Sequence, residues 1–474
     1  MKQLHELTIK EVLDGYQNKD FSCVDMVKHF QSRIEKYNPK LNIYLAQNKN
    51  ALKEAQEIDK EISKKGITRP LLGVPFAIKD NFLTKGIVTT ASSNILRDYD
   101  PQYESTVIKK LKEAGAIILG KTNMDSFAHG SSTETSDFGP TLNPWNPEKL
   151  PGGSSGGSAA AIAAQLATVA IGSETAGSIR QPSAWCGITG FKPTYGRVSR
   201  YGVIAMGSSL DSPGPMGRSV EDCALVAEVI SGKDDKDATT SPAPVEKYSD
   251  SLYSPDLRGV RIGIVKEYLL PDMSEDVKNL VLNAANELRQ LGATVDEVSL
   301  MDPRYSIGVY TVIQRSEVSS NLARFDGVRF GEKRDVLCEE TKRRIMLGTY
   351  TLSAGYYDAF YKKAQAVRTK IVSEFEEIFK TYDAIIGPVS PGIALSVGAS
   401  KNQPMFGEME DVLVEPSSIA GLTSVGLPCG FVDGLPIGLQ ITSNQLKEST
   451  ALKIADSYQR HTNFQVFPDL EKTL

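Results

Sequence analysis

Apolar residues in the first 65 positions recur at the spacing of a helix that buries one face. Between residues 23 and 34, Cys, Val, Met, Phe and Ile residues occupy positions 23, 24, 26, 27, 30 and 34, and charged or polar residues fill the positions between them. This period is typical of amphipathic helices that pack on a larger body. The pattern predicts a helical N-terminal layer over residues 1–65.

The pattern changes after residue 70. The run LLGVPFAIKDN (71–81) is continuously apolar until it ends in charge, and AIILGKTN (116–123) behaves in the same way. Such short apolar runs are typical of strands buried on both faces. Between them, STVIKKLKEAG (105–115) has helical spacing and a closing glycine. The alternation of strand, helix and strand predicts a mixed or parallel sheet.

The second half of the chain repeats this alternation. Strands are predicted at RIGIV (261–265), DAIIGPV (383–389) and PIGLQI (436–441), and a long helix is predicted over 277–291. The predicted strands are interleaved along the chain rather than segregated, and no internal repeat is visible. We therefore expect one large α/β domain over 66–474, with 1–65 packed on it as part of one compact unit.

Composition excludes several classes of protein. The 474 residues are 41% hydrophobic and 23% charged, which is ordinary for a folded soluble domain. The net charge of −5 argues against a free-standing nucleic-acid binder, because such proteins need a basic excess. No uncharged apolar stretch approaches the ~18 residues of a membrane span, and the N-terminus lacks the apolar core of a secretion signal. We expect a cytoplasmic protein.

The five cysteines are widely scattered and contain no CxxC pair. A disulfide framework or a zinc site is therefore not expected, and the environment is predicted to be reducing.

Two segments rich in glycine and serine carry the unusual chemistry. They are PGGSSGGSAAAIAA (151–164) and GSETAGSIRQP (172–182). A phosphate cradle fits poorly, because neither the Walker lysine position nor a GxGxxG step is present. A flexible linker also fits poorly, because the first segment lies between a proline and a strongly apolar helix. The remaining interpretation is a pocket lined by backbone that holds nucleophilic hydroxyls.

A serine nucleophile needs a base, and only four histidines are present. His129 alone is near the glycine-rich region, so a Ser-His-Asp triad is weakly supported. Lys79 is the other candidate, because it ends the apolar run 71–79 and burial of its amine would lower its pKa. The simpler alternative is a surface lysine at the end of a strand.

The chain resembles the amidase signature enzymes. The resemblance rests on IKDN (78–81), GGSSGGSAAA (152–161) and GSETAGSIRQP (172–182) at these separations. KPTYGRVSRYG (192–202), KRRIMLGTYTLSAGYYDAFYKKAQAVR (342–368) and AGLTSVGLPCGFVDGLPIGLQ (420–440) are similar to a narrower group. That group is the A subunits (GatA) of the Glu-tRNA(Gln) amidotransferase GatCAB, and the likeness covers almost the whole chain. It implies a single large amidase domain, with a mixed central sheet covered by helices on both faces.

The resemblance also implies roles for particular residues. Ser178 would be the nucleophile, Ser154 the bridging serine after a cis peptide bond, and Lys79 the base. The implied oxyanion donors are the backbone amides of Thr175, Ala176, Gly177 and Ser178.

Recognition of the substrate is implied for three further residues. Arg344 would bind the α-carboxylate of glutamine and Asp411 its α-ammonium, with Tyr310 as an aromatic wall. Without the resemblance, Arg344 would be assigned to a solvated basic turn with its neighbours, and Asp411 to the surface acids of EMED.

The implied activity is glutamine hydrolysis in a heterotrimeric, tRNA-dependent amidotransferase. The chain would supply ammonia that converts Glu-tRNA(Gln) to Gln-tRNA(Gln), and the complex could also act on Asp-tRNA(Asn). The implied partners are GatB-like and GatC-like subunits. The B subunit would hold most of the tRNA contact and use ATP and Mg²⁺, so that this chain would need no cofactor or metal of its own. The alternatives are a free-standing amidase for small or aryl amides and a non-catalytic scaffold.

Several positions depart from the group's usual pattern. Ala176 stands where glycine is usual, which predicts a turn that avoids positive φ at this residue. Ser126 and His129 stand where acidic and apolar residues are common, and the segment 331–341 is shorter than usual. We expect these changes to affect the rim of the pocket and contacts with partners rather than the serine and lysine relay.

Overall fold

The computed structural model describes residues 2–254, 256–403, 405–462 and 464–474. Within these residues, eleven strands form one sheet in the order β1-β3-β2-β4-β6-β5-β10-β11-β9-β7-β8. The strands are β1 (Tyr44–Gln47), β2 (Pro75–Lys79), β3 (Ile117–Thr122), β4 (Val169–Glu174), β5 (Thr189–Lys192), β6 (Ser212–Gly217), β7 (Arg261–Val265), β8 (Thr294–Val298), β9 (Ala384–Pro388), β10 (Thr423–Val432) and β11 (Leu435–Ser443).

The sheet is mixed, as predicted. Strand β2 runs parallel to β3 and β4, and β7 runs parallel to β8 and β9, so parallel pairing lies toward both ends of the sheet. The strands between these groups pair antiparallel, including the long β10–β11 hairpin. Parallel neighbours need a crossover connection, which helices supply here.

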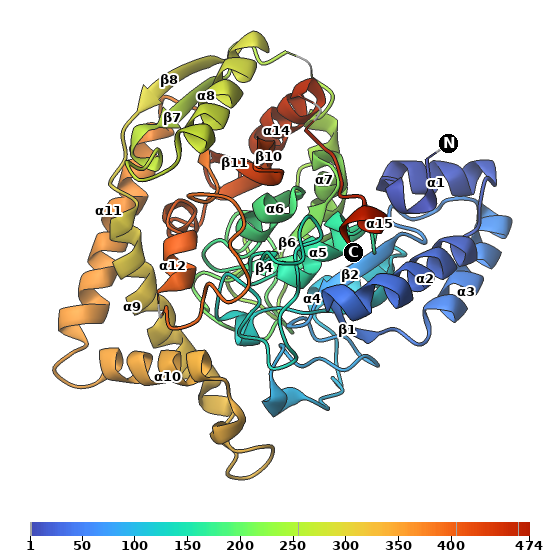
Figure 1. The fold of residues 1–474 in the computed structure, drawn as a ribbon, viewed down its shortest axis with the longest axis horizontal. Helices are drawn as coiled ribbons and strands as arrows, with labels where there is room; N and C mark the ends of the chain where they lie inside the picture. Colours follow the sequence, from blue (N-terminus) through green and yellow to red (C-terminus); the bar gives the residue numbers. More distant parts are fainter. Residues whose placement is uncertain (1, 255, 404, 463) are drawn as a thin grey trace.

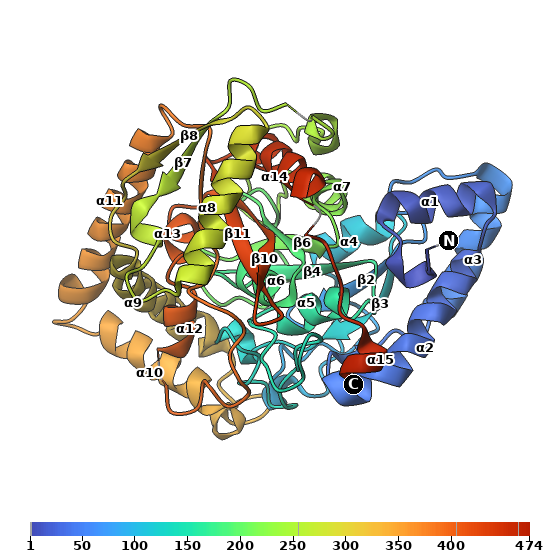
Figure 2. The ribbon, with the colours of Figure 1, turned by 45° about the horizontal axis from the view of Figure 1, so that its top comes forward.

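Fifteen α-helices surround the sheet within the described residues, and Figures 1 and 2 show them from two directions. They are α1 (Ile9–Asn18), α2 (Cys23–Leu41), α3 (Ala51–Lys65), α4 (Thr106–Glu113), α5 (Gly156–Ala163), α6 (Arg180–Cys186), α7 (Val220–Ile230), α8 (Glu275–Gln290), α9 (Arg304–Asn321), α10 (Glu339–Leu352), α11 (Lys363–Ile378), α12 (Phe406–Glu410), α13 (Glu415–Ile419), α14 (Glu448–Thr462) and α15 (Leu470–Thr473). None of the helices in the described ranges has both the length and the apolar character that a membrane span requires.

The N-terminal segment forms the predicted helices and one strand that the pattern did not predict. Helices α1 and α2 each begin with a capping box, at Thr8 and Ser22, which explains where they start. Phe30 and Ile34 are buried in the core that α2 shares with β2 to β4 (Figure 2). Strand β1 pairs antiparallel with β3 at the edge of the sheet. Its four residues are too few to show a clear alternation in the sequence.

Helices cover both faces of the sheet. On one face α6 packs directly on β10 and β11, where glycines leave room for its backbone. A Cβ on Gly438 would lie 2.4 Å from that of Ala184, and a Cβ on Gly426 would lie 3.2 Å from that of Arg180. On the opposite face, α7 packs beside Gly217. The start of α6 is thereby fixed at the centre of the sheet.

Helices α9, α10 and α11 form a layer beside the sheet (Figure 1). The short segment 331–338 contains only a 3-10 turn, Arg334–Val336, before α10 begins. Helices α9 and α10 are in backbone contact, because a Cβ on Gly348 would lie 1.9 Å from the carbonyl oxygen of Arg315.

This contact yields a stability prediction. We expect Gly348→Ala to lower the free energy of unfolding by about 1–3 kcal/mol, because the added methyl group must push the two helix backbones apart. Gly308→Ala in α9 is the matched control, since no atom lies within 4 Å of its Cβ position. It should raise stability by roughly 0.5–1 kcal/mol, as replacing a helical glycine does. Urea unfolding of both variants measures the difference, and equal effects would contradict the close packing.

Candidate active site

Lys79 ends β2 and is fully buried. Its Nζ donates to Ser154 Oγ at 2.8 Å and to the carbonyl oxygen of Ser173 at 3.0 Å. Burial lowers the pKa of Lys79 to about 7, although the carboxylates of Asp125, Asp211 and Glu174 oppose the shift. The alternative of a surface lysine is therefore wrong. Near neutral pH a large fraction of this amine is uncharged and able to accept a proton.

Ser154 lies in the loop that leads into α5. The Gly153–Ser154 peptide bond is cis, as the resemblance implied. The amide of Gly153 donates to Gln181 Oε1 at 2.9 Å, and the carbonyl of Ser154 accepts from the amide of Asp125 at 3.2 Å. A side chain at Gly153 would collide with Asp125, because its Cβ would lie 2.1 Å from Oδ2. The loop is thus held from both sides and needs glycine before the serine.

Ser178 lies in the turn between β4 and α6. Its carbonyl accepts from the amide of Ser155 at 3.2 Å, which places the two serine loops side by side. Among the described residues, the Ser178 hydroxyl makes no hydrogen bond, and it is not bonded to the hydroxyl of Ser154. The structure therefore joins Lys79 to Ser154 directly and leaves the Ser178 hydroxyl free of a competing partner.

The turn from Thr175 to Ser178 presents free backbone donors. Within the described part of the chain, none of these four amides donates a hydrogen bond to another residue. Ala176 avoids positive φ, as expected for a residue with a side chain. The Thr175 hydroxyl donates to Asp211 Oδ1 at 2.7 Å and fixes the start of the turn. Free amides in a fixed turn are able to stabilise an oxyanion.

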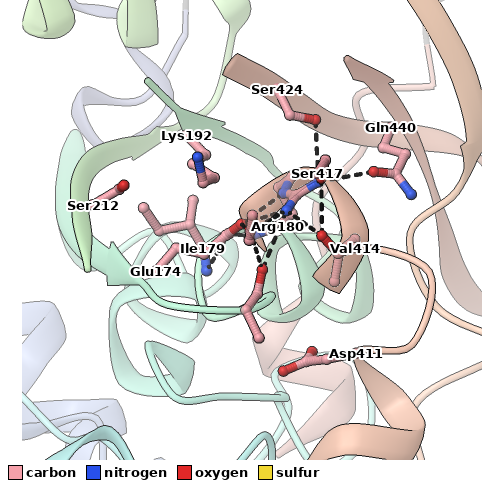
Figure 3. A network of polar contacts seen from close by, with 12 residues as sticks. Glu174, Ile179, Arg180, Lys192, Ser212, Asp411, Val414, Ser417, Ser424 and Gln440 are labelled. Carbon is pink, nitrogen blue, oxygen red and sulfur yellow. Dashed lines mark hydrogen bonds and ion pairs between the residues drawn. The ribbon is translucent and has the colours of Figure 1, made fainter. Parts of the chain in front are cut away.

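A buried ion pair closes the same turn (Figure 3). Glu174 Oε2 accepts from the amides of Ile179 and Arg180, at 3.0 Å each. Glu174 Oε1 accepts from Arg180 Nε at 2.8 Å and from its Nη2 at 2.6 Å. Both side chains are fully buried. The sequence analysis did not identify this pair, although the acid four residues before Ser178 was a visible signal.

Arg344 lies on α10 and borders a cavity of about 210 Å³. Its side chain is 4% exposed, whereas those of Lys342 and Arg343 are 35% and 43% exposed. Arg344 Nε donates to Glu340 Oε1 at 2.6 Å, and its Nη2 lies 3.5 Å from Glu408 Oε1. The solvated basic turn considered as an alternative is therefore wrong, because Arg344 is a buried helical residue facing the cavity.

Asp411 directly follows α12 and reaches the turn that carries Ser178. Ser131 Oγ donates to Asp411 Oδ2 at 2.7 Å, while Oδ1 is buried without a partner in the described structure. A Cβ on Gly177 would lie only 2.3 Å from Asp411 Oδ1, so the carboxyl group packs against the turn. Burial and nearby acids, Glu174 among them, raise the pKa of Asp411 well above its usual range. The surface alternative for Asp411 is wrong as well.

Tyr310 on α9 is 5% exposed, and burial raises the pKa of its hydroxyl well above the usual value.

His129 is fully buried and lies away from both serines. Its Nδ1 is 3.0 Å from Thr341 Oγ1 on α10, and it borders the same cavity as Arg344. Burial and the cations Arg344 and Arg315 lower the pKa of His129 well below its usual value. The contacts of this residue favour Lys79, not His129, as the base.

The described residues contain no group of three or more histidine, cysteine or acidic side chains arranged to hold a metal ion.

Comparison with known proteins gives consistent matches. Residues 25–452 match the family model described as Amidase. The chain is 46% identical to the A subunit of glutamyl-tRNA(Gln) amidotransferase from Geobacillus thermodenitrificans, over 97% of this chain and 98% of that protein. The crystal structure of the A subunit of glutamyl-tRNA(Gln) amidotransferase from Thermotoga maritima is similar, with 37% identity and a TM-score of 0.83 over 99% of this chain and 98% of that one. The peptide amidase from Stenotrophomonas maltophilia is 29% identical, with a TM-score of 0.86 over 98% and 99% of the two chains.

The contact between Lys79 and Ser154 predicts how Ser178 reacts. A fluorophosphonate should label Ser178 with loss of fluoride, and Ser178→Ala should abolish labelling. Ser154→Ala and Lys79→Met should each slow labelling by about 10²–10⁴-fold, because proton transfer from Ser178 loses its path. The double variant should be hardly slower than either single variant. Intact mass measured over time gives the rates, and losses that multiply in the double variant would argue against a relay.

The lowered pKa of Lys79 predicts a pH profile for the same reaction. The labelling rate should be constant above about pH 7 and fall about tenfold per pH unit below it, because protonation removes the base. Lys79→Met should give a slow rate without this step. A wild-type profile that stays flat to the pH of unfolding would remove Lys79 from this role.

Proposed function

We propose a function that starts from one premise: this chain belongs to the amidase family. It acts as the glutamine-hydrolysing A subunit of a glutamyl-tRNA(Gln) amidotransferase, and it supplies ammonia for the conversion of Glu-tRNA(Gln) to Gln-tRNA(Gln). The observation that carries the substrate assignment is the position of two buried, oppositely charged groups, Arg344 and Asp411, beside the nucleophile turn and its cavity.

The relay performs the chemistry in two half-reactions. Neutral Lys79 takes a proton from Ser154, and Ser154 takes one from Ser178 as the Ser178 oxygen attacks the side-chain carbonyl of glutamine. The free amides of the turn stabilise the oxyanion that develops. The C–N bond then breaks, the amide nitrogen receives a proton back through the relay, and ammonia leaves. Water cleaves the ester by the reverse proton path and releases glutamate.

Glutamine differs from a simple amide by its two charged groups. Arg344 pairs with the α-carboxylate and Asp411 with the α-ammonium, and Tyr310 forms a wall of the site. The unpartnered Asp411 Oδ1 and its raised pKa support this assignment, because a bound ammonium would supply the missing partner and favour the ionised form. A site that leaves such groups unpaired discriminates strongly against ligands that lack the matching charges.

The chain works as part of a complex. GatB-like and GatC-like subunits complete the amidotransferase, and the GatB-like partner holds most of the tRNA contact. This partner also uses ATP and Mg²⁺ to activate Glu-tRNA(Gln). The names of the relatives support this division, because they describe one subunit of a tRNA-dependent amidotransferase.

Substrate preference tests the assignment against a general amidase. Butyramide is glutamine without its two charged groups, so wild type should prefer glutamine strongly. Arg344→Met or Asp411→Asn should raise the glutamine KM by roughly 30-fold or more, since an unpaired buried charge costs about 2–5 kcal/mol. Neither change should alter butyramide hydrolysis by more than about threefold, which is small beside that cost. Released ammonia measures both reactions.

Arg343→Met is the matched control for this experiment, because Arg343 neighbours Arg344 on α10 but its side chain is 43% exposed. It should leave both substrates unaffected. Equal losses on glutamine and butyramide in the Arg344 and Asp411 variants would mean that these residues support the fold, and would favour a free-standing amidase.

A further inference from the structure

Glu408 lies buried between two arginines that come from different helices. Arg315 Nη2 on α9 donates to Glu408 Oε1 at 2.8 Å, and Arg344 Nη2 on α10 lies 3.5 Å from the same oxygen. The side chains of Glu408, Arg315 and Arg344 are 1%, 2% and 4% exposed. At such burial, two guanidinium groups around one point repel each other strongly unless a carboxylate lies between them.

The packing of α9 on α10 forces the two arginines together. Gly348 seats α10 against the carbonyl of Arg315, one helical turn beyond Arg344. Arg344 has a second carboxylate, Glu340, at its Nε. Arg315 has no other ion pair within the described residues, and its Nε and Nη1 are buried without partners. Glu408 is therefore the only acid of the described chain that neutralises both helices' cations.

The two acids determine which edge of Arg344 is left for a ligand. Glu340 holds Nε and Glu408 lies at Nη2, so Nη1 is the remaining nitrogen, and all three residues border the same cavity. Two arginines and two glutamates sum to no net charge. A zwitterionic amino acid adds no net charge either, so it enters this cluster without leaving an uncompensated ion.

Glu408 also fixes the position of Asp411. Helix α12 has only five residues, and a helix of that length is not stable without tertiary contacts. The buried pair of Glu408 with Arg315 attaches α12 to α9. Asp411 follows α12 directly, and its amide donates to the carbonyl of Gly407 at 3.0 Å. Both groups assigned to the charged end of the substrate therefore depend on Glu408.

We propose that Glu408 is a positioning residue for substrate specificity. It orients the guanidinium of Arg344 and, through α12, holds the carboxyl of Asp411 beside the turn, while the reacting amide lies at the relay. The inference rests on the proposed function, since it assumes that Arg344 and Asp411 bind the α-carboxylate and α-ammonium of glutamine. Loss of the charge at Glu408 affects binding of the charged end and spares the chemistry at Ser178.

Glu408→Gln tests this role because it removes the charge and keeps the shape. We expect the glutamine KM to rise about tenfold or more with kcat within about twofold, and butyramide kinetics to stay within about twofold. Glu408→Asp, which keeps the charge on a shorter side chain, should recover part of the glutamine KM. The matched control is Glu339→Gln, since Glu339 is an acid on α10 that is 85% exposed and pairs with Lys342.

The outcomes separate this inference from the proposed function. A wild-type chain without preference for glutamine over butyramide would overturn both. A wild-type preference that Glu408→Gln leaves unchanged would overturn the positioning role alone, as would equal losses on both substrates. If Glu408→Gln does not fold, Glu408→Asp decides the question: a loss confined to glutamine supports the role, and an equal or absent loss contradicts it.

Discussion

The arrangement of the site depends on the buried ion pair between Glu174 and Arg180. Besides Glu174, Arg180 donates to the carbonyls of Ala176 and Val414 and to side chains on α13, β10 and β11 (Figure 3). A charge buried this deeply destabilises the fold unless each donor is satisfied, so the turn is stable in one geometry only. The position of the Ser178 peptide is thereby linked to the C-terminal half of the sheet.

This link explains how distant parts of the chain meet at one site. The N-terminal half supplies the relay from the ends of β2 and β4 and from the loop before α5, while the C-terminal half supplies the charged groups from α10 and α12. Asp411 packs against Gly177, three residues before the Arg180 that anchors the following segment through Val414. The reaction centre and the specificity groups are therefore fixed in the same frame, and a shift of one would disturb the other.

The sequence predicted the parts of the fold whose cause is local. The apolar runs at 71–79 and 261–265 are buried strands, the period around Phe30 is a buried helix face, and the end of the first run delivers Lys79 to Ser154. Residues whose role depends on distant partners were not predicted. Glu408 belongs to an acidic stretch that looks solvated, and its partner Arg315 lies 93 residues away. Ser131 likewise becomes meaningful only when Asp411 packs beside it.

Burial alone does not make a lysine a base, and three lysines of this sheet show why. Lys79, Lys121 and Lys192 are all fully buried, and burial lowers the pKa of each. Lys121 pairs with Asp80 at 3.1 Å, which favours its charged form. Lys192 has a pKa lowered to about 7, like Lys79, but it donates to the carbonyls of Leu422 and Pro193, which have no proton to give.

Of these three amines, Lys79 alone combines the lowered pKa with a hydroxyl neighbour in the loop beside the nucleophile turn. Ser154 is able to pass a proton in either direction, because a hydroxyl both donates and accepts. The function of the lysine is thus decided by the group placed against it. That placement depends in turn on the glycine-rich loop that brings Ser154 to the end of β2.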